Sequence, residues 1–406
     1  MTEVLQEHER QQRGDAGVLA TLRATPAPVR ALLAGVLVNQ LGTFFQAYLV
    51  LFLTARGFTS AQAGWALGVY GAGLIAGLLT GGSLGDRIGP RPTTLLSMAG
   101  SAVLLPTVLY LHQYAAVLVV VALVGATTQL FRPAAAAMLA THTAKHRRVM
   151  IFALYRLVQN IGATTAPLLG AVLVAVSYDL LFWVEAASTA AFAALAIFLF
   201  PRGAKEQAEA GPRGGYGALL RDRRYVLFLL AMFLNVFVYV QYVAVLPLAM
   251  RAEGLATGWY AAMLSLNGFM VVAFELLMTK VTQRRPPRWV AVAGFALLGL
   301  GHSLYGFQWG LAAFVAGTVV WSLAELIGGP TMFAYPALAA PEELLARYQG
   351  AAQAMYGLGA VLGPVCGVAL WLALGPPVWW VFGLVSLAGL AAAWTGMRHA
   401  GAAHES

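Results

Sequence analysis

Residues 115–139 read AAVLVVVALVGATTQLFRPAAAAML, a run in which Arg132 is the only charged residue. A helix of about 20 apolar residues is long enough to cross the roughly 30 Å hydrocarbon layer of a bilayer. A second window of this kind runs from Val378 to Trp394. Both windows predict helices that lie in lipid.

The composition of the whole chain extends this prediction. Of the 406 residues, 60% are hydrophobic and 10% are charged, whereas about 25% of the residues in an average soluble domain are charged. A soluble core cannot bury so much apolar surface. The apolar windows predict twelve membrane-spanning helices, near residues 31–53, 62–82, 93–111, 115–140, 149–176, 180–200, 225–249, 258–280, 289–307, 310–335, 349–373 and 378–396.

The positions of Lys and Arg predict the orientation. If both chain ends are cytoplasmic, 21 of the 25 basic residues lie inside, only Arg56 and Arg251 fall in outside loops, and Arg132 and Arg156 fall within spans. The net charge of +9 then reflects this inner-face bias, and no nucleic-acid partner is expected. The first 28 residues lack the apolar core of a cleavable signal sequence, so the first span is expected to direct membrane insertion.

The chain contains an internal repeat. Four residues of the first half recur in the second half at one offset of 197 positions: Pro133, Gly162, Pro167 and Gly170 correspond to Pro330, Gly359, Pro364 and Gly367. The longest polar interruption, residues 201–224, separates the two halves. We predict an all-α polytopic membrane protein with twelve transmembrane helices in two pseudo-symmetric six-helix bundles. Its segments are a cytoplasmic segment 1–28, a first bundle 29–200, a cytoplasmic linker 201–224, a second bundle 225–396 and a cytoplasmic tail 397–406.

A polar stripe marks the first helix of each half. The residues lie at positions i, i+4 and i+7, which share one helical face: Asn39, Thr43 and Gln46 in the first half, and Asn235, Tyr239 and Tyr242 in the second. In lipid, such a stripe turns toward other helices or water. We therefore predict that the two stripes face each other across a polar cavity between the halves, a plan that recurs in transporters built from repeats.

The loop after the second span reads GSLGDRIGPR at residues 82–91. It resembles the signature loop of the major facilitator superfamily, a Gly-x-Leu-x-Asp-Arg-x-Gly-x-Arg pattern that is carried here by Gly82, Asp86, Arg87, Gly89 and Arg91. The glycines permit a short turn, and Asp86 is expected near a helix N-terminus or a basic partner, where it latches the cytoplasmic ends of the halves.

The signature loop is not repeated intact in the second half. The offset of 197 places Gln283 and Arg284 at the positions of Asp86 and Arg87, so the second loop keeps a positive charge and lacks the acid. If the latch forms, it is asymmetric.

The fifth span carries Gly162-x-x-x-Ala166-Pro167-x-x-Gly170. This stretch resembles an element of exporters of the drug:proton antiporter type, although two glycines of that element are replaced by alanine. Close helix packing alone also explains small residues at this spacing, and a proline allows a helix to bend. The eleventh span carries the related Gly359, Gly363, Pro364 and Gly367.

Charged residues within spans need a reason, because each costs roughly 2.5–3.5 kcal/mol at the centre of a helix. Glu185 is expected to extend toward water at the outer side. Glu275 precedes Lys280 by five residues, so an interfacial ion pair and a functional role are both open.

Glu325 lies near the middle of the tenth span. The offset pairs it with Thr128, one turn from Arg132, so Glu325 and Arg132 are expected to approach each other beside the cavity, with Glu325 as the proton carrier. Arg156 completes this charge network or contacts an anionic substrate. The alternative is a fixed salt bridge that only holds helices together.

Aromatic residues are expected to line the cavity beside these charges. Tyr239, Tyr242, Trp321 and Tyr356 offer stacking surfaces for amphiphilic organic molecules, although aromatic residues at helical spacing also serve in packing.

The resemblance implies a proton-coupled exporter of a small organic compound, drug-like or a natural product, that works by alternating access in a bacterial inner membrane. Its expected partners are the substrate, protons and the lipid bilayer, and it is expected to act as a monomer without a metal or cofactor, driven by the proton gradient. No Walker loop, metal-spaced His cluster or serine nucleophile elbow indicates an enzyme. Two alternatives stay open: an importer or facilitator of a metabolite, and a sensor or scaffold that lacks transport.

Overall fold

The computed structural model describes residues 25–201, 216–307 and 309–397, and all regular structure in these residues is helical. Parts of the predicted segments 1–28, 201–224 and 397–406 lie outside the described residues. The α-helices are α3 (Ala27–Leu41), α4 (Phe45–Ala55), α5 (Ser60–Ile88), α6 (Pro90–Thr107), α7 (Tyr114–Thr141), α8 (Arg148–Val176), α9 (Tyr178–Leu199), α10 (Tyr216–Arg221), α11 (Arg223–Tyr239), α12 (Gln241–Ala244), α13 (Leu246–Ala252), α14 (Thr257–Thr282), α15 (Pro287–Leu304), α16 (Leu311–Ala339), α17 (Leu345–Leu374) and α18 (Val378–Gly396).

In the part of the chain that the structure describes, twelve helices are long and apolar enough to cross a membrane, which confirms the predicted number of spans. The first span combines α3 with α4, and the seventh combines α11 with α12. The predicted second span ended at residue 82, but α5 continues to Ile88. The sequence did not predict this last helical stretch, because three polar residues interrupt the apolar window although their backbone is helical. These residues are Ser83, Asp86 and Arg87.

The helices of the two halves follow the internal repeat. For example, α6 starts at Pro90 and α15 at Pro287, which is 197 residues later. The same offset relates the starts of α5 and α14, of α7 and α16, and of α8 and α17, as well as the two pairs of short 3-10 turns between them. The repeat that is visible in scattered Gly and Pro residues therefore extends to the boundaries of the helices.

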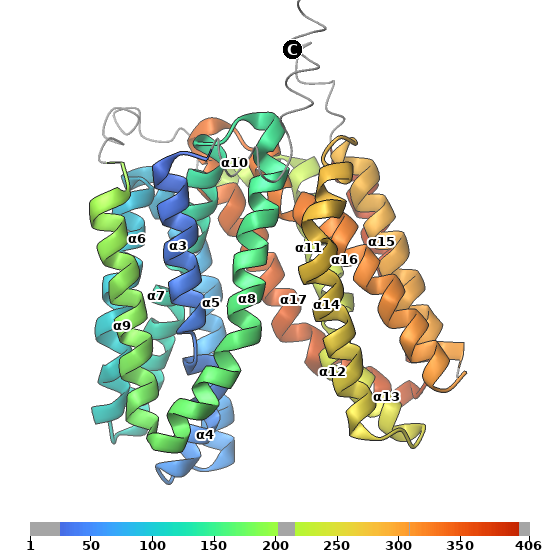
Figure 1. Cartoon of the computed structure of the whole chain (residues 1–406), viewed down its shortest axis with the longest axis horizontal. Helices are drawn as coiled ribbons and strands as arrows, with labels where there is room; N and C mark the ends of the chain where they lie inside the picture. Colours follow the sequence, from blue (N-terminus) through green and yellow to red (C-terminus); the bar gives the residue numbers. More distant parts are fainter. Residues whose placement is uncertain (1–24, 202–215, 308, 398–406) are drawn as a thin grey trace, which may run out of the picture.

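The two groups of helices lie side by side and meet at one end (Figure 1). Contacts between the halves join α5 and α7 to α17, and α8 to α14 and α16. The ribbons diverge toward the opposite end, where α4 and α13 lie (Figure 1). This arrangement leaves the central part of α7, α8, α11, α16 and α17 available to form a site between the halves.

The outer faces of the helices are apolar. Large side chains there are exposed, as is Phe198, whose exposed fraction is 80%. Such a surface is unfavourable in water but suits a helix bundle surrounded by lipid. Further examples spread over both halves are Trp65, Val103, Val172, Leu277 and Leu372.

A stripe of glycines brings α5 against α7. Gly73, Gly77 and Gly81 are four residues apart, and a Cβ atom added to any of them would lie within about 3 Å of main-chain atoms of α7. Small residues at this spacing let two helices approach until their backbones touch. The stripe thus fixes the core of the first half and the position of α7, which carries Arg132.

The first span is broken between α3 and α4, and Glu185 closes the break. Glu185 of α9 is buried, and its Oε2 accepts hydrogen bonds from the main-chain nitrogens of Phe44 (2.8 Å) and Phe45 (2.7 Å). The expectation that Glu185 extends toward water is therefore wrong. The free N–H groups at the start of a helix attract a carboxylate, and in lipid they need a partner within the protein.

The seventh span is interrupted at the equivalent place, after Tyr239, and Gln241 fills that gap. Gln241 is fully buried, and its Nε2 donates to the carbonyl oxygens of Phe237 (2.7 Å) and Gly363 (2.9 Å). At the break in the first half, the carboxylate of Glu185 accepts hydrogen bonds from main-chain nitrogens. At the equivalent break in the second half, the amide of Gln241 donates hydrogen bonds to main-chain carbonyls.

Candidate substrate and proton-coupling site

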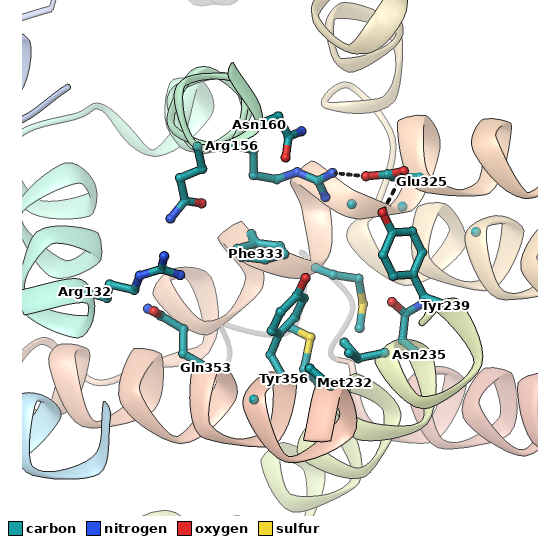
Figure 2. Close-up of a pocket in the computed structure, with 18 of the residues that line it drawn as sticks. Arg132, Arg156, Asn160, Met232, Asn235, Tyr239, Glu325, Phe333, Gln353 and Tyr356 are labelled. Carbon is teal, nitrogen blue, oxygen red and sulfur yellow. Dashed lines mark hydrogen bonds and ion pairs between the residues drawn. The ribbon is translucent and has the colours of Figure 1, made fainter. Parts of the chain in front are cut away.

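A cavity of about 400 Å³ lies between the two halves. Ligand cavities of small molecules typically measure about 300–1,000 Å³. Residues from both halves line it, with polar side chains that include three charged groups (Figure 2). The polar residues of the lining are Gln40, Gln46, Gln129, Arg132, Arg156, Gln159, Asn160, Asn235, Tyr239, Glu325, Gln353 and Tyr356.

An ion-pair cluster at the cavity wall joins the two halves. Arg156 of α8 places its Nε 3.0 Å from Oε1 of Glu275 and its Nη2 3.1 Å from Oε1 of Glu325. The two carboxylates come from α14 and α16, so one guanidinium of the first half is shared by two carboxylates of the second. All three side chains are nearly buried, with exposed fractions of 9%, 1% and 11%. Buried charges of this kind are stable only when they are paired.

Glu325 is held by neutral donors as well. Its Oε2 accepts hydrogen bonds from the hydroxyl of Tyr239 (3.3 Å) and from Nδ2 of Asn267 (3.1 Å), which also contacts Ser322. Figure 2 shows the side chains of Tyr239 and Arg156 converging on this carboxylate. Glu325 therefore connects α8, α11, α14 and α16, and any change in its charge is felt by all four helices.

Arg156 fits because the facing helix has no side chain at one position. A Cβ atom added to Gly329 would overlap the guanidinium of Arg156. The ring of Phe333 lies one turn further along α16, and its centroid is 5.2 Å from Cζ of Arg156. Glu325, Gly329 and Phe333 recur every four residues, so one face of α16 supplies the partner, the space and an aromatic contact for this cation.

Arg132 lies apart from the ion-pair cluster. It lines the cavity from α7 and does not pair with Glu325. The prediction that these two residues approach each other is therefore wrong. Arg156 pairs with Glu325 instead. Within the described residues, the Nε of Arg132 is buried without a hydrogen-bond partner, and no ion pair of Arg132 is found. Glu275 likewise pairs with Arg156 across the halves, and not with Lys280 or the neighbouring arginines.

Several residues predicted to line the cavity lie elsewhere. Asn39 is buried, the hydroxyl of Thr43 donates to the carbonyl of Asn39 (2.8 Å), and Thr128 donates to carbonyls of its own helix. Trp321 is buried with its Nε1 donating to the hydroxyl of Tyr305 (2.6 Å), and Tyr242 packs on Trp321 at a ring distance of 5.1 Å. These last two residues form the packing behind Tyr239, which does reach the cavity.

Gln46, Asn235, Tyr239 and Tyr356 line the cavity as predicted from the polar and aromatic pattern. The break in the first span explains why Gln40 replaces Asn39 there, because a helical face is not continuous across Gly42–Phe44. The sequence pattern did not predict four further polar residues of the lining, which are Gln129, Gln159, Asn160 and Gln353. The pattern did not predict Asn267 either, although its spacing of eight residues from Glu275 puts both on one face of α14.

The signature loop joins the halves at the end where they meet. Oδ1 of Asp86 accepts a hydrogen bond from the main-chain nitrogen of Ala346 (2.7 Å), and Oδ2 accepts one from that of Arg347 (3.1 Å). The guanidinium of Arg347 is 3.7 Å from the same carboxylate. Asp86 thus lies at the N-terminus of α17, where a helix favours negative charge.

The other residues of the loop support this contact. Gly82 and Gly85 leave room for Ala346, and Gly89 has a φ of 87° that glycine adopts without strain. Arg91 donates to the carbonyls of Ala196 (3.3 Å) and Ile197 (2.8 Å), and Arg87 is exposed.

A tyrosine outside the spans contacts the same region. The hydroxyl of Tyr216 in α10 donates to the carbonyl of Leu79. Burial raises the pKa of Tyr216 to about 12, and the nearby charge of Asp86 acts in the same direction. The hydroxyl therefore stays protonated at neutral pH and remains a donor.

The glycines of the fifth and eleventh spans serve close packing. A Cβ atom at Gly162 would clash with Gln40 of α3, and one at Gly170 would clash with Tyr48 of α4. In the second half, Gly359, Gly363 and Gly367 face α11 and the side chain of Gln241 in the same way. Pro364 lies inside α17, while the side chain of Pro167 lies outside the described part of α8.

Comparisons with known proteins agree with this architecture. The family model of the Major Facilitator Superfamily matches residues 32–364, with a second match at 251–405. A Na⁺, Li⁺, K⁺/H⁺ antiporter of Planococcus maritimus is 26% identical over 345 residues, which cover 76% of this chain and 80% of that protein. The multidrug resistance protein MdtH of Cronobacter sakazakii is 26% identical over 52% of this chain and 54% of its own length.

Solved structures share the fold at low sequence identity. One is the fucose transporter FucP of the major facilitator superfamily, in the outward conformation. It has a TM-score of 0.72 at 16% identity and covers 92% of this chain and all of its own chain. The human organic anion transporter MFSD10 has a TM-score of 0.68 at 16% identity, covering 91% of this chain and 99% of that chain.

Twelve spans around a polar cavity define a polytopic membrane transporter and not an enzyme. The chain belongs to the major facilitator superfamily.

Proposed function

We propose that this protein is a proton-coupled exporter of a small organic compound that works by alternating access. The observation that carries the proposal is the cluster at the cavity wall, in which Glu275 and Glu325 share the single guanidinium of Arg156. A proton on one carboxylate removes charge from a contact that joins the halves. Protonation is thereby linked to the packing of one half against the other.

The proposed orientation puts the signature loop in the cytoplasm of a bacterial cell, with the protein in the inner membrane and both chain ends inside. Basic residues concentrate at that end of the described helices, among them Arg91, Lys145 and Arg285, while Arg56 and Arg251 lie at the other. Bacterial relatives support this assignment of the membrane.

In this orientation the contacts between the halves close the cytoplasmic side. Asp86 binds the N-terminus of α17, and Nη1 of Arg148 donates to the carbonyl of Ala337 (2.8 Å). The cavity then opens outward. Transport requires these inner contacts to break while the outer ends of the halves approach, which is the rocking motion of a two-repeat transporter.

The two carboxylates have different proposed roles. Glu325 lines the cavity and has the more exposed side chain, so a proton that enters the cavity reaches it first. Glu275 is buried behind Arg156. When Glu325 is neutral, Glu275 still pairs with the guanidinium, and the cation is not left alone at a site where an unpaired charge is costly.

Export is the proposed direction of transport. The names of two relatives, a cation/proton antiporter and a multidrug resistance protein, support proton exchange and outward movement of organic compounds. The partial exporter element around Gly162 and Gly170 points the same way. Antiport requires that proton and substrate exclude each other, and a site with more carboxylates than cations at one wall favours such competition.

The experiment has two stages. Cells with and without the protein are first screened for resistance to, and accumulation of, a panel of toxic dyes and antibiotics. Compounds that accumulate less are then loaded into proteoliposomes with a pH-sensitive dye inside. We expect uphill movement of the compound when a pH gradient is imposed, with proton flux in the opposite direction.

Glu325→Gln is expected to abolish uphill movement while exchange at equilibrium continues. If Glu325→Gln protein still drives the compound uphill, the proposed role of Glu325 is wrong. Downhill flux without proton movement would identify a facilitator, and uptake with protons an importer. A protein that changes the accumulation of no compound would instead be a sensor or scaffold.

A further inference from the structure

Groups of opposite formal charge flank the cavity. On one side, Glu275 and Glu325 face a single partner, Arg156, so this cluster carries a formal charge of −1 when both carboxylates are ionised. On the other side, Arg132 enters the cavity from α7 with a formal charge of +1. Figure 2 shows Arg132 and Glu325 entering from different sides, with Phe333 and Tyr356 between them.

The isolation of Arg132 needs an explanation. A guanidinium within a membrane-spanning helix is costly unless it pairs with another group or faces water, and such residues mark ligand pathways. Within the described chain, its Nε is buried without a hydrogen-bond partner, and none of the ion pairs includes it. A planar fork of N–H donors that lines a cavity is suited to a carboxylate or another oxyanion.

The space between these charged groups is apolar and aromatic. The rings of Phe333 and Tyr356 meet edge to face with centroids 5.6 Å apart, and Met232 adds a flexible apolar contact. The amides of Gln129 and Gln353 line the cavity as well. The cavity of about 400 Å³ therefore offers an apolar middle and charged ends.

We propose that the substrate is a zwitterionic organic molecule, whose acidic group pairs with Arg132 and whose basic group lies at Glu325, with an apolar or aromatic body between them. The inference rests on the proposed function, because it takes the cavity as the substrate site, and it adds the chemical class.

Charge complementarity favours a zwitterionic substrate over an organic cation or an organic anion. The four charged groups sum to zero when both carboxylates are ionised, so a molecule with both charges leaves the site neutral. An organic cation without an acidic group meets the unpaired charge of Arg132. An organic anion without a basic group adds negative charge and favours protonation of Glu325, which opposes exchange. The basic end of a zwitterion competes directly with the proton at Glu325, as antiport requires.

The test uses four forms of one rigid compound and purified protein in nanodiscs without any gradient. The zwitterion is 4′-(aminomethyl)biphenyl-4-carboxylic acid. Its carboxamide is a cation, its N-acetyl derivative is an anion, and the N-acetyl carboxamide is neutral. Calorimetric titration at neutral pH gives the four affinities for the unmodified protein. We expect the zwitterion to bind at least about tenfold more tightly than each of the others, since each lost charge removes one charge-assisted contact.

Variants then locate the acidic group. Arg132→Gln is expected to weaken zwitterion binding by about 10- to 100-fold and to leave cation binding unchanged or stronger, while Arg132→Lys restores part of the affinity. Arg30→Gln changes an exposed arginine outside the cavity and serves as the matched control. Glu325→Gln is expected to weaken binding of the zwitterion and of the cation, and to leave binding of the anion unchanged or stronger.

Two results overturn the proposal: a zwitterion that binds no better than the other three forms, including no binding at all, or an unchanged preference in Arg132→Gln. Because binding is measured without a gradient, this failure is separate from that of the proposed function. If the protein prefers the zwitterion but moves no protons, the proposed substrate class is supported and the proposed proton coupling is wrong.

Discussion

The carboxylate of Glu185 holds the main-chain nitrogen of Phe44 at 2.8 Å, deep inside the first half of the protein. Through this hydrogen bond and a second one to Phe45, α9 closes the break between α3 and α4. The break lies between Gln40 and Gln46, which both line the cavity. The shape of this wall of the cavity therefore depends on a side chain that never reaches it.

Two substitutions of Glu185 distinguish the contribution of its charge from that of its hydrogen bonds. Glu185→Ala leaves two buried N–H groups without a partner, so we expect a loss of about 2–4 kcal/mol in the free energy of unfolding. Glu185→Gln keeps an acceptor oxygen and should lose about 1 kcal/mol or less. Unfolding in sodium dodecyl sulfate, followed by tryptophan fluorescence, measures both, with the exposed Glu253→Ala as control. Equal losses for the alanine and glutamine variants would contradict the capping role.

The glycine stripe of α5 gives a second prediction. Gly77→Ala places a methyl group within about 3 Å of the backbone of Ala126, which cannot move aside as a side chain can. We expect a loss of about 1–3 kcal/mol from this overpacking. Gly68→Ala, on the same helix with open space around it, should be neutral or more stable by up to about 1 kcal/mol. Thermal unfolding of the two purified variants compares them, and a stable Gly77→Ala protein would count against the close approach.

In the proposed orientation, Asp86 is expected to control the balance between the closed and open forms of the end where the halves meet. Asp86→Asn removes the negative charge at the N-terminus of α17 and should shift the population toward the inward-open form by about 5- to 150-fold. Spin labels at Ile88 and Glu343, in a Cys366→Ser background, report the distance between the halves. A label pair at Ile88 and Lys145, both in the first half, is the control. An unchanged distance distribution for the first pair would rule out the latch.

Gly329 offers a way to disturb the ion-pair cluster without removing a charge. Gly329→Ala should push the guanidinium of Arg156 away from Glu325, because the new methyl group would overlap it. We expect coupled transport to fall by about tenfold or more, because breaking a buried ion pair costs several kcal/mol. Gly268→Ala, in open space on α14, should transport normally.

The same prediction has an internal check. Lysine has a smaller charged group than arginine, so Arg156→Lys in the Gly329→Ala background should recover part of the lost coupling. Transport in proteoliposomes under an imposed pH gradient measures the single and double variants side by side. No recovery, together with normal binding of the compound, would mean that the methyl group acts elsewhere.

The architecture was largely predictable because lipid imposes simple rules on sequence. Every span must be helical and mostly apolar, so the windows between residues 31 and 396 reveal the twelve helices and only their ends shift. The offset between Gly162 and Gly359 was visible because glycines mark close contacts that each half needs separately.

The site was harder to predict because its partners are set by packing. Glu325 was expected beside Arg132, since the repeat aligns α16 with α7, but the face of α16 that carries Glu325 packs against α8 and α14. The partners of Glu185 and Asp86 include main-chain N–H groups, which no residue pattern displays. Asn39 was misplaced because the break after Leu41 turns the polar face of the helix.

The duplicated chain seals its two equivalent gaps with side chains of different ionisation. Glu185 can gain a proton, and the amide of Gln241 cannot at any physiological acidity. The joint in the first span thus contains an ionisable group, and its counterpart in the seventh span does not. The two halves therefore share their helix boundaries and differ in whether a charge can form at this joint.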